Sequence, residues 1–365
     1  MVWFGFGFNY FGQICKTVNG SEENRQSAVK VTVPVRLDVR DCGWTPGDGA
    51  ARGGAREQLG DIRTSWSRTA DLRLRGEGRV FLRGFGASAQ AARFRGCRDA
   101  QLTERHLTLA FGDRAECWSL DTCADLPVWT MEYSDGPPSA LPLLSGGYVT
   151  TNPPIFRPLS PELCAVSLAL GLEHAVLLTA SGSVYTWGLG SHGQLGHGEL
   201  EREEEPRVVE ALWGVAMAQV AAGGWHSATI STGGDLYMWG WNESGQLGMP
   251  ARGLQGEKLN TDQNQGTGSE TEGGDDSRGV FISIQAFPAL VDLPEDAEVT
   301  VVSCGSRHTA AVTGDYGQLG HGGSCSSDRP LRVDFFSRHG LFVLDVVCGP
   351  WNTFVSAVEK EEEQS

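Results

Sequence analysis

The chain of 365 residues has little of several features that mark common protein classes. No apolar run approaches the ~18 residues of a membrane-spanning helix, and the first residues lack the basic segment and cleavage site of a secretory signal peptide. The nine cysteines are odd in number and contain no Cys-x-x-Cys pair, which disfavours a disulfide framework and a zinc ribbon. We therefore expect free thiols, a cytosolic or nuclear location, and no membrane association.

Motifs of catalysis are also missing. The sequence has no Gly-x-Ser-x-Gly elbow, no Cys/His pair at a readable spacing and no phosphate-binding loop. The glycines between Gly5 and Gly12 suggest a nucleotide loop, but no helix with a ribose-binding acid follows them. We expect no catalytic residue, no cofactor and no enzymatic activity.

Charge is distributed unevenly. The net charge of −16 divides into +1 for residues 1–149 and −17 for residues 150–365. The acidic part would repel DNA at long range, so direct DNA binding is disfavoured and a basic protein partner is favoured. Between Arg36 and Arg114 lie 15 arginines and 10 acidic residues. These arginines could contact phosphates or an acidic protein, or they could be ordinary solvated side chains.

Glycine and tryptophan, in contrast, are plentiful, with 49 and 11 residues, and many of them fall in a repeat. Two copies begin 52 residues apart, and in each the histidine precedes a Trp-Gly pair by 13 residues and a Gly-Gln-Leu-Gly turn by about 20. A third copy lacks ten residues of its middle. The copies contain, in order, His174, Trp187 and Gln194; His226, Trp239 and Gln246; and His308 and Gln318.

Each copy has the pattern of two short strands and a glycine-rich turn. Residues 175–178 form an apolar run typical of a buried strand, and residues 183–187 alternate like a second strand. We expect Leu195 and Leu247 to be buried in their turns, and Trp187 and Trp239 to pack between sheets. A period near 50 predicts a repeat architecture, here an all-β ring of blades.

The two ends of the chain complement each other. Residues 348–358 resemble the first half of a repeat with Asn352 in the histidine position, and residues 2–13 resemble a second half. Pairing the terminal strands would close the ring and remove its exposed edges. Degenerate copies begin near residue 68 and at 110–120, which makes six countable blades. A seventh could be hidden in residues 141–159.

We expect one propeller over residues 1–358, with degenerate repeats in 1–150 and clear repeats in 160–248 and 281–358. Residues 249–280 are rich in Gly, Ser, Thr, Asp and Glu, so they predict a disordered acidic insertion. Residues 359–365 are an acidic tail.

The elements His-(Ser/Thr)-Ala, aromatic-x-Trp-Gly and Gly-Gln-Leu-Gly-His-Gly together resemble the regulator of chromosome condensation repeat. The resemblance is strong over residues 160–358 and faint over 1–120. It implies a β-propeller of four-stranded blades, usually seven, closed by its termini. The gap between Val312 and Gly317 then implies one truncated blade near residues 300–320.

The repeated histidines could suggest a metal site. A shared zinc needs each ring nitrogen within ~2.1 Å of one point, whereas equivalent positions on neighbouring blades are separated by roughly 10 Å. We therefore expect no metal, and histidines that bond to neighbouring backbone.

Trp225, Trp241, Asn242, Glu243 and Trp351 lie at strand ends or in turns. Exposed aromatic side chains there could anchor a partner, and we treat these five residues as candidate partner-binding residues. Packing in the core is the alternative for the tryptophans.

The resemblance, joined to the lack of catalytic motifs, favours a non-catalytic protein-binding scaffold. Its partner would be a chromatin-associated enzyme, such as a histone-modifying one, in the nucleus or on chromosomes, with a cytosolic pool. One alternative is a guanine-nucleotide exchange factor for a Ran-like small GTPase. Another is a substrate-recruiting subunit of a ubiquitin ligase.

Overall fold

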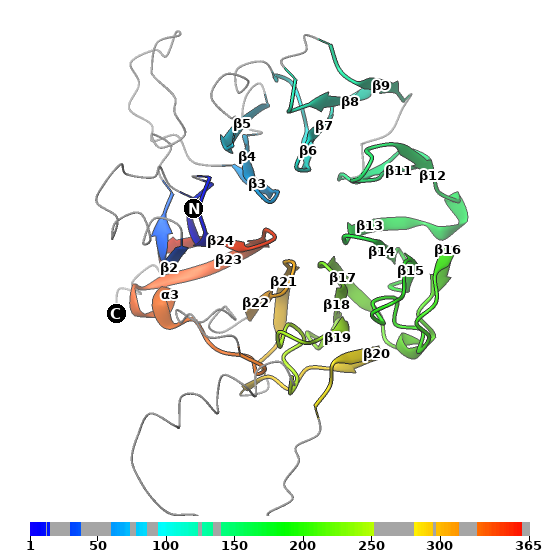
Figure 1. The fold of residues 1–365 in the computed structure, drawn as a ribbon, viewed down its shortest axis with the longest axis vertical. Coiled ribbons are helices and arrows are strands. Elements are labelled where there is room, and N and C mark those ends of the chain that lie inside the picture. The colour runs from blue at the N-terminus through cyan, green and yellow to red at the C-terminus, as the bar shows by residue number, and fades with distance from the viewer. Residues whose placement is uncertain are drawn as a thin grey trace, which may run out of the picture.

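In the part of the chain that the structure describes, the strands form seven sheets that stand around a central opening (Figure 1). The computed structural model describes residues 1–11, 13–14, 30–37, 60–73, 78–85, 94–122, 126–133, 140–251, 281–294, 297–313 and 327–359. We call the sheets blades 1 to 7, counted in chain order from the sheet that contains β3. The predicted all-β propeller is confirmed.

The first three blades come from the half with faint repeats. Their strands are β3 (Asp61–Thr64), β4 (Arg68–Arg73) and β5 (Arg79–Gly84) in blade 1; β6 (Asp99–Leu102), β7 (His106–Ala110), β8 (Arg114–Ser119) and β9 (Trp129–Glu132) in blade 2; and β10 (Leu143–Leu144), β11 (Gly147–Val149) and β12 (Phe156–Pro158) in blade 3. The sheet expected to be hidden in residues 141–159 is thus blade 3.

The remaining blades come from the half with clear repeats, and all neighbouring strands within a blade are antiparallel. They are β13 (Ala165–Leu170), β14 (His174–Thr179), β15 (Val184–Gly188) and β16 (Glu203–Val208) in blade 4; β17 (Met217–Ala222), β18 (His226–Ser231), β19 (Leu236–Trp241) and β20 (Ile284–Leu290) in blade 5; β21 (Val299–Cys304) and β22 (Thr309–Thr313) in blade 6; and β23 (Leu341–Cys348), β24 (Asn352–Glu359), β1 (Val2–Phe8) and β2 (Lys30–Arg36) in blade 7.

Short helices connect some blades. They are the 3-10 turns η2 (Pro161–Leu163) and η3 (Glu210–Leu212) and the helix α3 (Asp334–Arg338). Among the described residues, no helix has the length and apolar character needed to cross a membrane.

Blade 7 closes the ring as the complementary ends predict. Its strand order is β2-β1-β24-β23, so the first and last strands of the chain pair side by side. In this pairing Gly7 lies opposite Asn352, as Gly240 lies opposite His226 in blade 5. Both glycines have φ near +105°, a conformation that other residues rarely adopt. The N-terminal strand therefore takes the place of a Trp-Gly strand.

The core lies between neighbouring blades. All six residues of β14 and of β18 are buried, because sheets cover these strands on both faces. Trp239 is fully buried against Val176, Leu178 and Val184 of the preceding blade. The outer strand β16 instead carries consecutive glutamates and a proline, which protect an exposed sheet edge.

Blade 6 is the smallest sheet among the described residues, with two strands, as the missing repeat residues predict. Residues 314–326, which include the third Gly-Gln-Leu-Gly motif, lie outside the described residues, as do residues 252–280 of the insertion predicted over 249–280 and residues 360–365 of the tail predicted over 359–365. Met249 and Ala251 are buried, so the insertion begins later than predicted. Phe336 of α3 is fully buried in the apolar layer between blades 6 and 7. Phe6, at the place where other blades have tryptophan, lines a narrow apolar cavity in that layer.

Candidate protein-binding face

A histidine at the start of the second strand joins each clear repeat to the next blade. The three pairs are His174 Nε2 with Ser227 Oγ at 2.9 Å, His226 Nε2 with Thr309 Oγ1 at 3.0 Å, and His308 Nε2 with Thr353 Oγ1 at 3.1 Å. Ser227 donates in turn to the carbonyl of Gln194, on the blade that supplies His174. Thr309 does the same to Gln246. These hydrogen bonds hold neighbouring blades together. We call the set of histidine-to-hydroxyl and hydroxyl-to-carbonyl bonds the histidine–hydroxyl relay.

The hydrogen-bond partners of Nε2 in the repeated histidines differ from the sequence-based expectation. We expected a backbone partner for these histidines, and the structure provides a hydroxyl on the next blade. Because the single proton of Ser227 Oγ is donated to Gln194, the hydroxyl must accept from Nε2–H of His174. Nε2 of His174 therefore carries a proton, and burial, which lowers the pKa of this imidazole to about 4, leaves Nδ1 unprotonated at neutral pH.

A glycine three positions before each histidine makes room for the ring. A Cβ atom at Gly223 would lie 2.3 Å from Cε1 of His226, and one at Gly305 would lie 2.2 Å from Cε1 of His308. Real Cβ atoms do not approach other atoms so closely. The Gly-x-x-His spacing is thus a packing requirement of the relay.

Burial keeps the three histidines uncharged. Desolvation lowers the pKa of His174 and His308 to about 4. It also lowers the pKa of His226 to about 3, with a further decrease from the other two imidazoles. Burial disfavours the charged form of a histidine, so at neutral pH the relay consists of neutral hydrogen bonds only.

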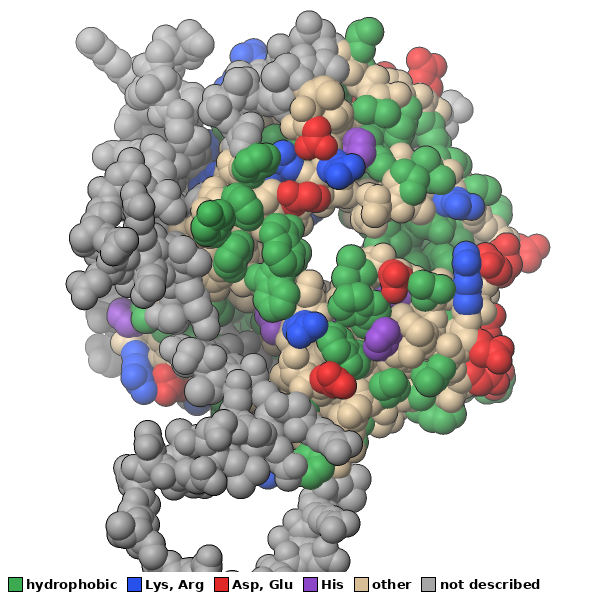
Figure 2. All heavy atoms as spheres, viewed as in Figure 1, with side chains coloured by type: hydrophobic (Ala, Val, Ile, Leu, Met, Phe, Trp, Pro, Cys, Tyr) green, Lys and Arg blue, Asp and Glu red, His purple; other side chains and the backbone are tan. Residues whose placement is uncertain are grey.

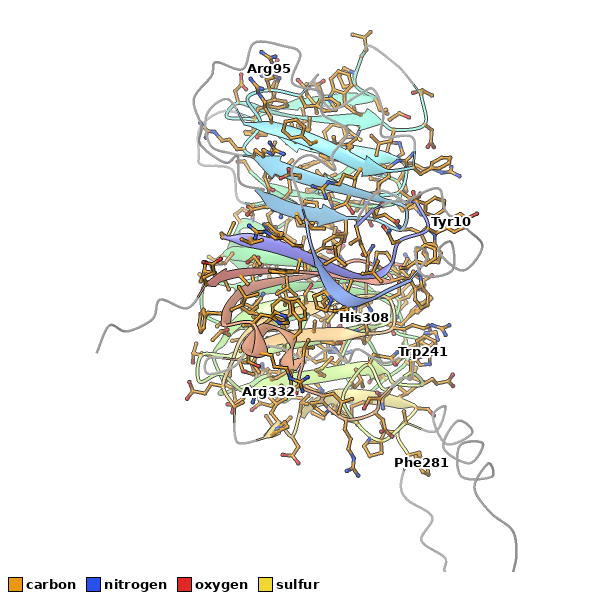
Figure 3. All side chains as sticks on the ribbon, turned by 90° about the vertical axis from the view of Figure 1, so that its left-hand side faces the viewer. Tyr10, Arg95, Trp241, Phe281, His308 and Arg332 are labelled. Carbon is orange, nitrogen blue, oxygen red and sulfur yellow. The ribbon has the colours of Figure 1, made fainter. Side chains whose placement is uncertain are left out.

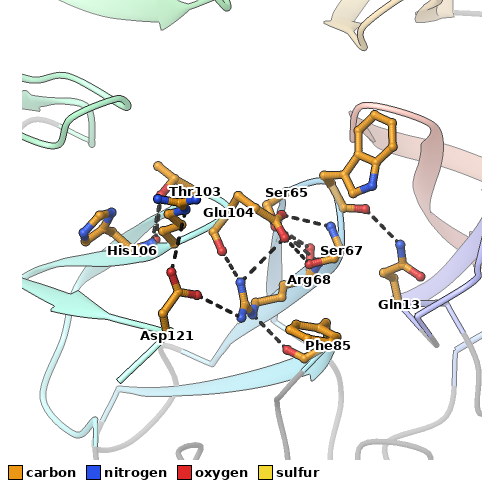
Figure 4. A network of polar contacts seen from close by, with 11 residues as sticks. Gln13, Ser65, Ser67, Arg68, Phe85, Thr103, Glu104, His106 and Asp121 are labelled. Atoms are coloured by element: carbon orange, nitrogen blue, oxygen red, sulfur yellow. Dashed lines mark hydrogen bonds and ion pairs between the residues drawn. The ribbon is translucent and has the colours of Figure 1, made fainter. Parts of the chain in front are cut away.

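The first half of the ring uses charges at the same place. Arg68 lies opposite Gly84 in the sheet register, where blade 5 has His226 opposite Gly240. Its guanidinium donates to the carbonyl of Glu104 on blade 2 and lies 3.7 Å from the carboxylates of Glu104 and Asp121 (Figure 4). Arg68 therefore links blades 1 and 2 by ion pairs.

The residue that precedes each histidine points out of the ring. The occupants of this position are Glu173, Trp225 and Arg307, followed by Trp351 before Asn352. All four are exposed or partly buried, whereas His174, His226 and Asn352 are buried. The relay thus fixes a set of side chains on one face of the disc, beside the central opening.

One aromatic cluster on this face spans blades 4 and 5. The rings of Trp225 and Trp241 meet edge to face with centroids 5.5 Å apart, and His192 contacts both at 5.7 Å. The indole nitrogen of Trp225 donates to a carboxylate oxygen of Glu173 at 3.0 Å. The guanidinium of Arg307 lies over the Trp241 ring, 4.8 Å from its centroid. We call this the Trp225 cluster.

A second aromatic cluster spans blades 7 and 1. Trp351 meets Trp66 with centroids 5.8 Å apart, and a chain of further ring contacts extends outward. Its members are Trp351, Trp66, Phe8, Tyr10, Phe11 and Phe85. Tyr10 and Phe85 are 61% and 59% exposed, so water still covers much of this cluster. We call it the Trp351 cluster.

Both clusters lie on the same face. Figure 3 shows Tyr10 and Trp241 on one side of the disc, with His308 further inside. In Figure 2, hydrophobic side chains gather on two sides of the central opening, with charged groups between them. Exposed aromatic side chains of this extent are typical of interaction surfaces.

Of the five predicted partner-binding residues, Trp225, Trp241 and Trp351 lie on this face and Glu243 is exposed beside Trp241. Asn242 is fully buried. Its amide donates to the carbonyls of Met249 and Ile282, and its Oδ1 accepts from the backbone N–H of Leu247. Asn242 therefore stabilises its turn and is inaccessible to a partner.

Sequence reasoning missed His192, Arg307, Trp66, Tyr10 and Phe85. The signal for Arg307 was present, since it stands directly before His308 as Trp225 stands before His226. Tyr10 could have been found in the same way, because residues 7–14 align with the turn that contains Glu243. For Trp66 and Phe85 the sequence carried no clear repeat to align.

In the part of the chain that the structure describes, no group of three or more histidines, cysteines or acidic side chains could hold a metal ion. The described cysteines are free thiols. Burial raises the pKa of Cys348 to about 12 and also raises the pKa of Cys304, so both stay protonated at neutral pH.

Ring closure by the two termini, radial sheets and the histidine–hydroxyl relay define a β-propeller built from sequence repeats. The comparisons with known proteins specify which kind. The regulator of chromosome condensation (RCC1) repeat model matches residues 181–230, 233–312 and 313–356, and a second model of this repeat matches 165–194 and 217–246. The chain belongs to the RCC1 repeat family.

Relatives along the whole chain support this assignment. RCC1 domain-containing protein 1 of Homo sapiens is 44% identical over 98% of this chain and 97% of its own length. The protein of that name in Mus musculus is 41% identical over 99% and 98%. The E3 ubiquitin-protein ligase HERC2 of Homo sapiens is 34% identical over 50% of this chain and 3% of its own length.

Among solved structures, Prp20p of Saccharomyces cerevisiae, described together with its binding to Gsp1p and histones, has a TM-score of 0.66 and 15% identity over 99% of this chain and 92% of its own. A second structure, of Kap60 bound to yeast RCC1 (Prp20), gives a TM-score of 0.67 and 16% identity over 99% and 90%. At this identity the likeness shows that the fold is shared.

Proposed function

We propose that the chain is a non-catalytic protein-binding scaffold that docks a chromatin-associated enzyme on the face around its central opening. The observation that carries the proposal is the pair of aromatic clusters on one face, of which the Trp225 cluster is half-buried and the Trp351 cluster is exposed. Large aromatic side chains held rigidly in place are the usual anchors of protein interfaces. The ring contacts and the bond from Trp225 to Glu173 provide that rigidity.

The partner's chemistry and location are inferred from the family. Prp20p is described by its binding to Gsp1p and histones, and yeast RCC1 by its complex with Kap60. By analogy we place this chain in the nucleus, on or near chromosomes, with a protein partner. Its net charge of −16 disfavours direct contact with DNA.

Affinity purification of the tagged full chain tests the proposal when it is combined with matched variants. The first variant replaces Trp225 and Trp351 by serine, and the control replaces Trp213, which is 65% exposed on the other side of blade 4 from the relay. We expect wild type and Trp213→Ser to retain one stoichiometric enzyme partner, measured by quantitative mass spectrometry, and the double variant to lose it. Equal recovery by all three proteins would contradict the proposal.

The second candidate function is guanine-nucleotide exchange on a Ran-like small GTPase. The fold likeness to Prp20p, described with Gsp1p, favours it. The measurement is the release of fluorescent guanosine diphosphate from a Ran-like GTPase in the presence of the full chain. Acceleration of release by orders of magnitude would replace the scaffold proposal. Recruitment of substrates to a ubiquitin ligase rests on the HERC2 likeness over half of the chain.

A further inference from the structure

The Trp225 cluster contains a cation that is presented to solvent in an ordered position. Arg307 is exposed, and its guanidinium lies over the ring of Trp241. A guanidinium that stacks on an aromatic face keeps its N–H groups free at its edges. In the described part of the chain, Arg307 forms no ion pair, so these donors point to water.

Three acidic groups on this face differ from Arg307, because each of them has a polar partner. Glu173 accepts a hydrogen bond from the indole of Trp225. On the far side of the opening, Glu104 and Asp121 are paired with Arg68. Glu243 is exposed in the turn that follows Trp241. Around the Trp225 cluster, Arg307 and Glu243 are thus the charges without an ion pair within the described residues, and Arg307 is the cation of the two.

We propose that Arg307 binds a carboxylate of the docked protein, so that the partner presents an aspartate or glutamate flanked by apolar side chains. This inference rests on the proposed function and names the anchor. The fork of a guanidinium matches the two oxygens of a carboxylate. The flanking apolar side chains would cover Trp225 and Trp351, exclude water and strengthen the ion pair.

The charges of the face select a carboxylate rather than a phosphate. Arg307 provides one positive charge over the Trp241 ring, Glu173 provides a negative charge bonded to Trp225 in the same cluster, and Glu243 lies two residues after Trp241. The two glutamates repel any incoming anion, and they repel a doubly charged phosphate more than a singly charged carboxylate, whose charge Arg307 neutralises. The whole-chain charge of −16 favours a basic partner, and the stacked Arg307 favours one acidic residue within that partner.

Selection of phage-displayed random dodecapeptides on the immobilised full chain tests this inference. We expect enriched sequences to share an aspartate or glutamate next to an aromatic or aliphatic residue. A fluorescein-labelled peptide of the enriched sequence is then titrated by fluorescence polarisation. Because a charge-assisted bidentate bond is lost, Arg307→Gln should weaken its binding by ~10-fold or more. Arg307→Lys should give a smaller loss.

Two controls make the result specific. Replacing the acidic residue of the peptide by its amide should cause the same loss on the wild type and no further loss on Arg307→Gln. Arg202→Gln, which alters an exposed arginine on the outer side of blade 4, should bind like the wild type. Melting temperatures of the variants exclude misfolding, since Arg307 is exposed.

Enrichment of basic peptides, failure to enrich any sequence, or binding unchanged by Arg307→Gln would overturn the inference. Its failure is distinguishable from failure of the scaffold proposal. If partner capture depends on Trp225 and Trp351 but not on Arg307, the face is a docking site and the carboxylate anchor is wrong. If capture ignores the tryptophans as well, the proposed function fails.

Discussion

The junction between blades 5 and 6 and the junction between blades 1 and 2 occupy equivalent places in the ring but are held by different chemistry. In the first, neutral His226 bonds the hydroxyl of Thr309. In the second, Arg68 pairs with Glu104 and Asp121 on the next blade. The propeller therefore needs a bond across this position and accepts more than one kind. Each junction also fixes the start of a strand that follows a tryptophan, with Trp225 directly before His226 and Trp66 two residues before Arg68.

The largest expected difference between the junctions is their response to acid. The pKa values of the three relay histidines are lowered to about 4, 3 and 4, below the ~6.5 of an unfolded chain. The unfolded state binds more protons in this window, so the stability of the histidine junctions is complete above pH 6.5 and falls as pH decreases toward 4. At pH 5 the loss is on the order of 2 kcal/mol per histidine.

Hydrogen exchange at pH 7 and pH 5, corrected for the intrinsic exchange rates, measures the loss of stability at the histidine junctions. We expect protection to fall in β18 and β22 and to change less in β4 and β7. Asp345 opposes the trend slightly, because burial raises its pKa and its protonation therefore favours the folded state at low pH. A uniform loss of protection over all blades would contradict the assignment.

Removal of one relay histidine is expected to have the next largest effect. His226 is fully buried, so His226→Ala leaves a cavity and removes the hydrogen bond that Thr309 Oγ1 accepts, while its bond to Gln246 remains. We expect a loss of about 3 kcal/mol in the free energy of unfolding, measured by urea denaturation. The matched control is His339→Ala, which removes an exposed histidine. Equal stability of the two variants would show that the relay does not stabilise the ring.

The junction between blades 1 and 2, which Arg68 holds by ion pairs, should respond to removal of the charge and to salt. Arg68→Gln removes the charge that pairs with Glu104 and Asp121, whose side chains are about half exposed. We expect a loss of about 2 kcal/mol, smaller than for His226 because water can solvate both carboxylates. Raising salt to ~1 M should weaken this junction in the wild type and have little effect on the variant.

The readout is exchange protection of β4 and β7 at low and high salt, with β18 and β22 as the internal reference. Equal salt sensitivity of both regions would remove the distinction between an ionic and a neutral junction.

In the described part of the chain, the junction between blades 7 and 1 has neither a histidine–hydroxyl bond nor an arginine ion pair at this position. A substitution that supplies such a bond should therefore stabilise the protein. Asn352 stands in the histidine position, and among the described residues its Oδ1 and the Thr69 hydroxyl on blade 1 are buried without hydrogen-bond partners. Gly349 already provides the Gly-x-x-His spacing. Asn352→His should reach Thr69 and stabilise the protein by about 1 kcal/mol, seen as a higher melting temperature. Destabilisation equal to that of Asn352→Ala would mean that the imidazole does not fit.

The sequence predicted the parts of the fold that repeat. Trp239 and Leu247 are buried as their recurring positions indicate, and pairing of β1 with β24 follows from the incomplete ends. It did not predict that Arg68 replaces a histidine, because the Trp-Gly and Gly-Gln-Leu-Gly signals that would align residue 68 are absent there.

The candidate site could be predicted only in part, since its residues meet across blades. Trp225 and Trp351 were predicted as candidate partner-binding residues from their places at strand ends, and the structure places both on one face. The hydroxyl in His-(Ser/Thr) was visible, but its partner lies on another blade, and only the ring geometry brings Thr309 to His226. Asn242 was misjudged because a turn residue in sequence can be fully buried in a stack of blades.

The central claim is that the face carrying Trp225 and Trp351 is where the protein docks its partner. Hydroxyl-radical footprinting with mass spectrometry tests it most directly, on the full chain alone and in complex with its copurified partner. We predict that oxidation of Trp225, Trp351 and Tyr10 falls several-fold in the complex while that of Trp213 is unchanged. Protection of Trp213 with no change at the other three residues would contradict the claim.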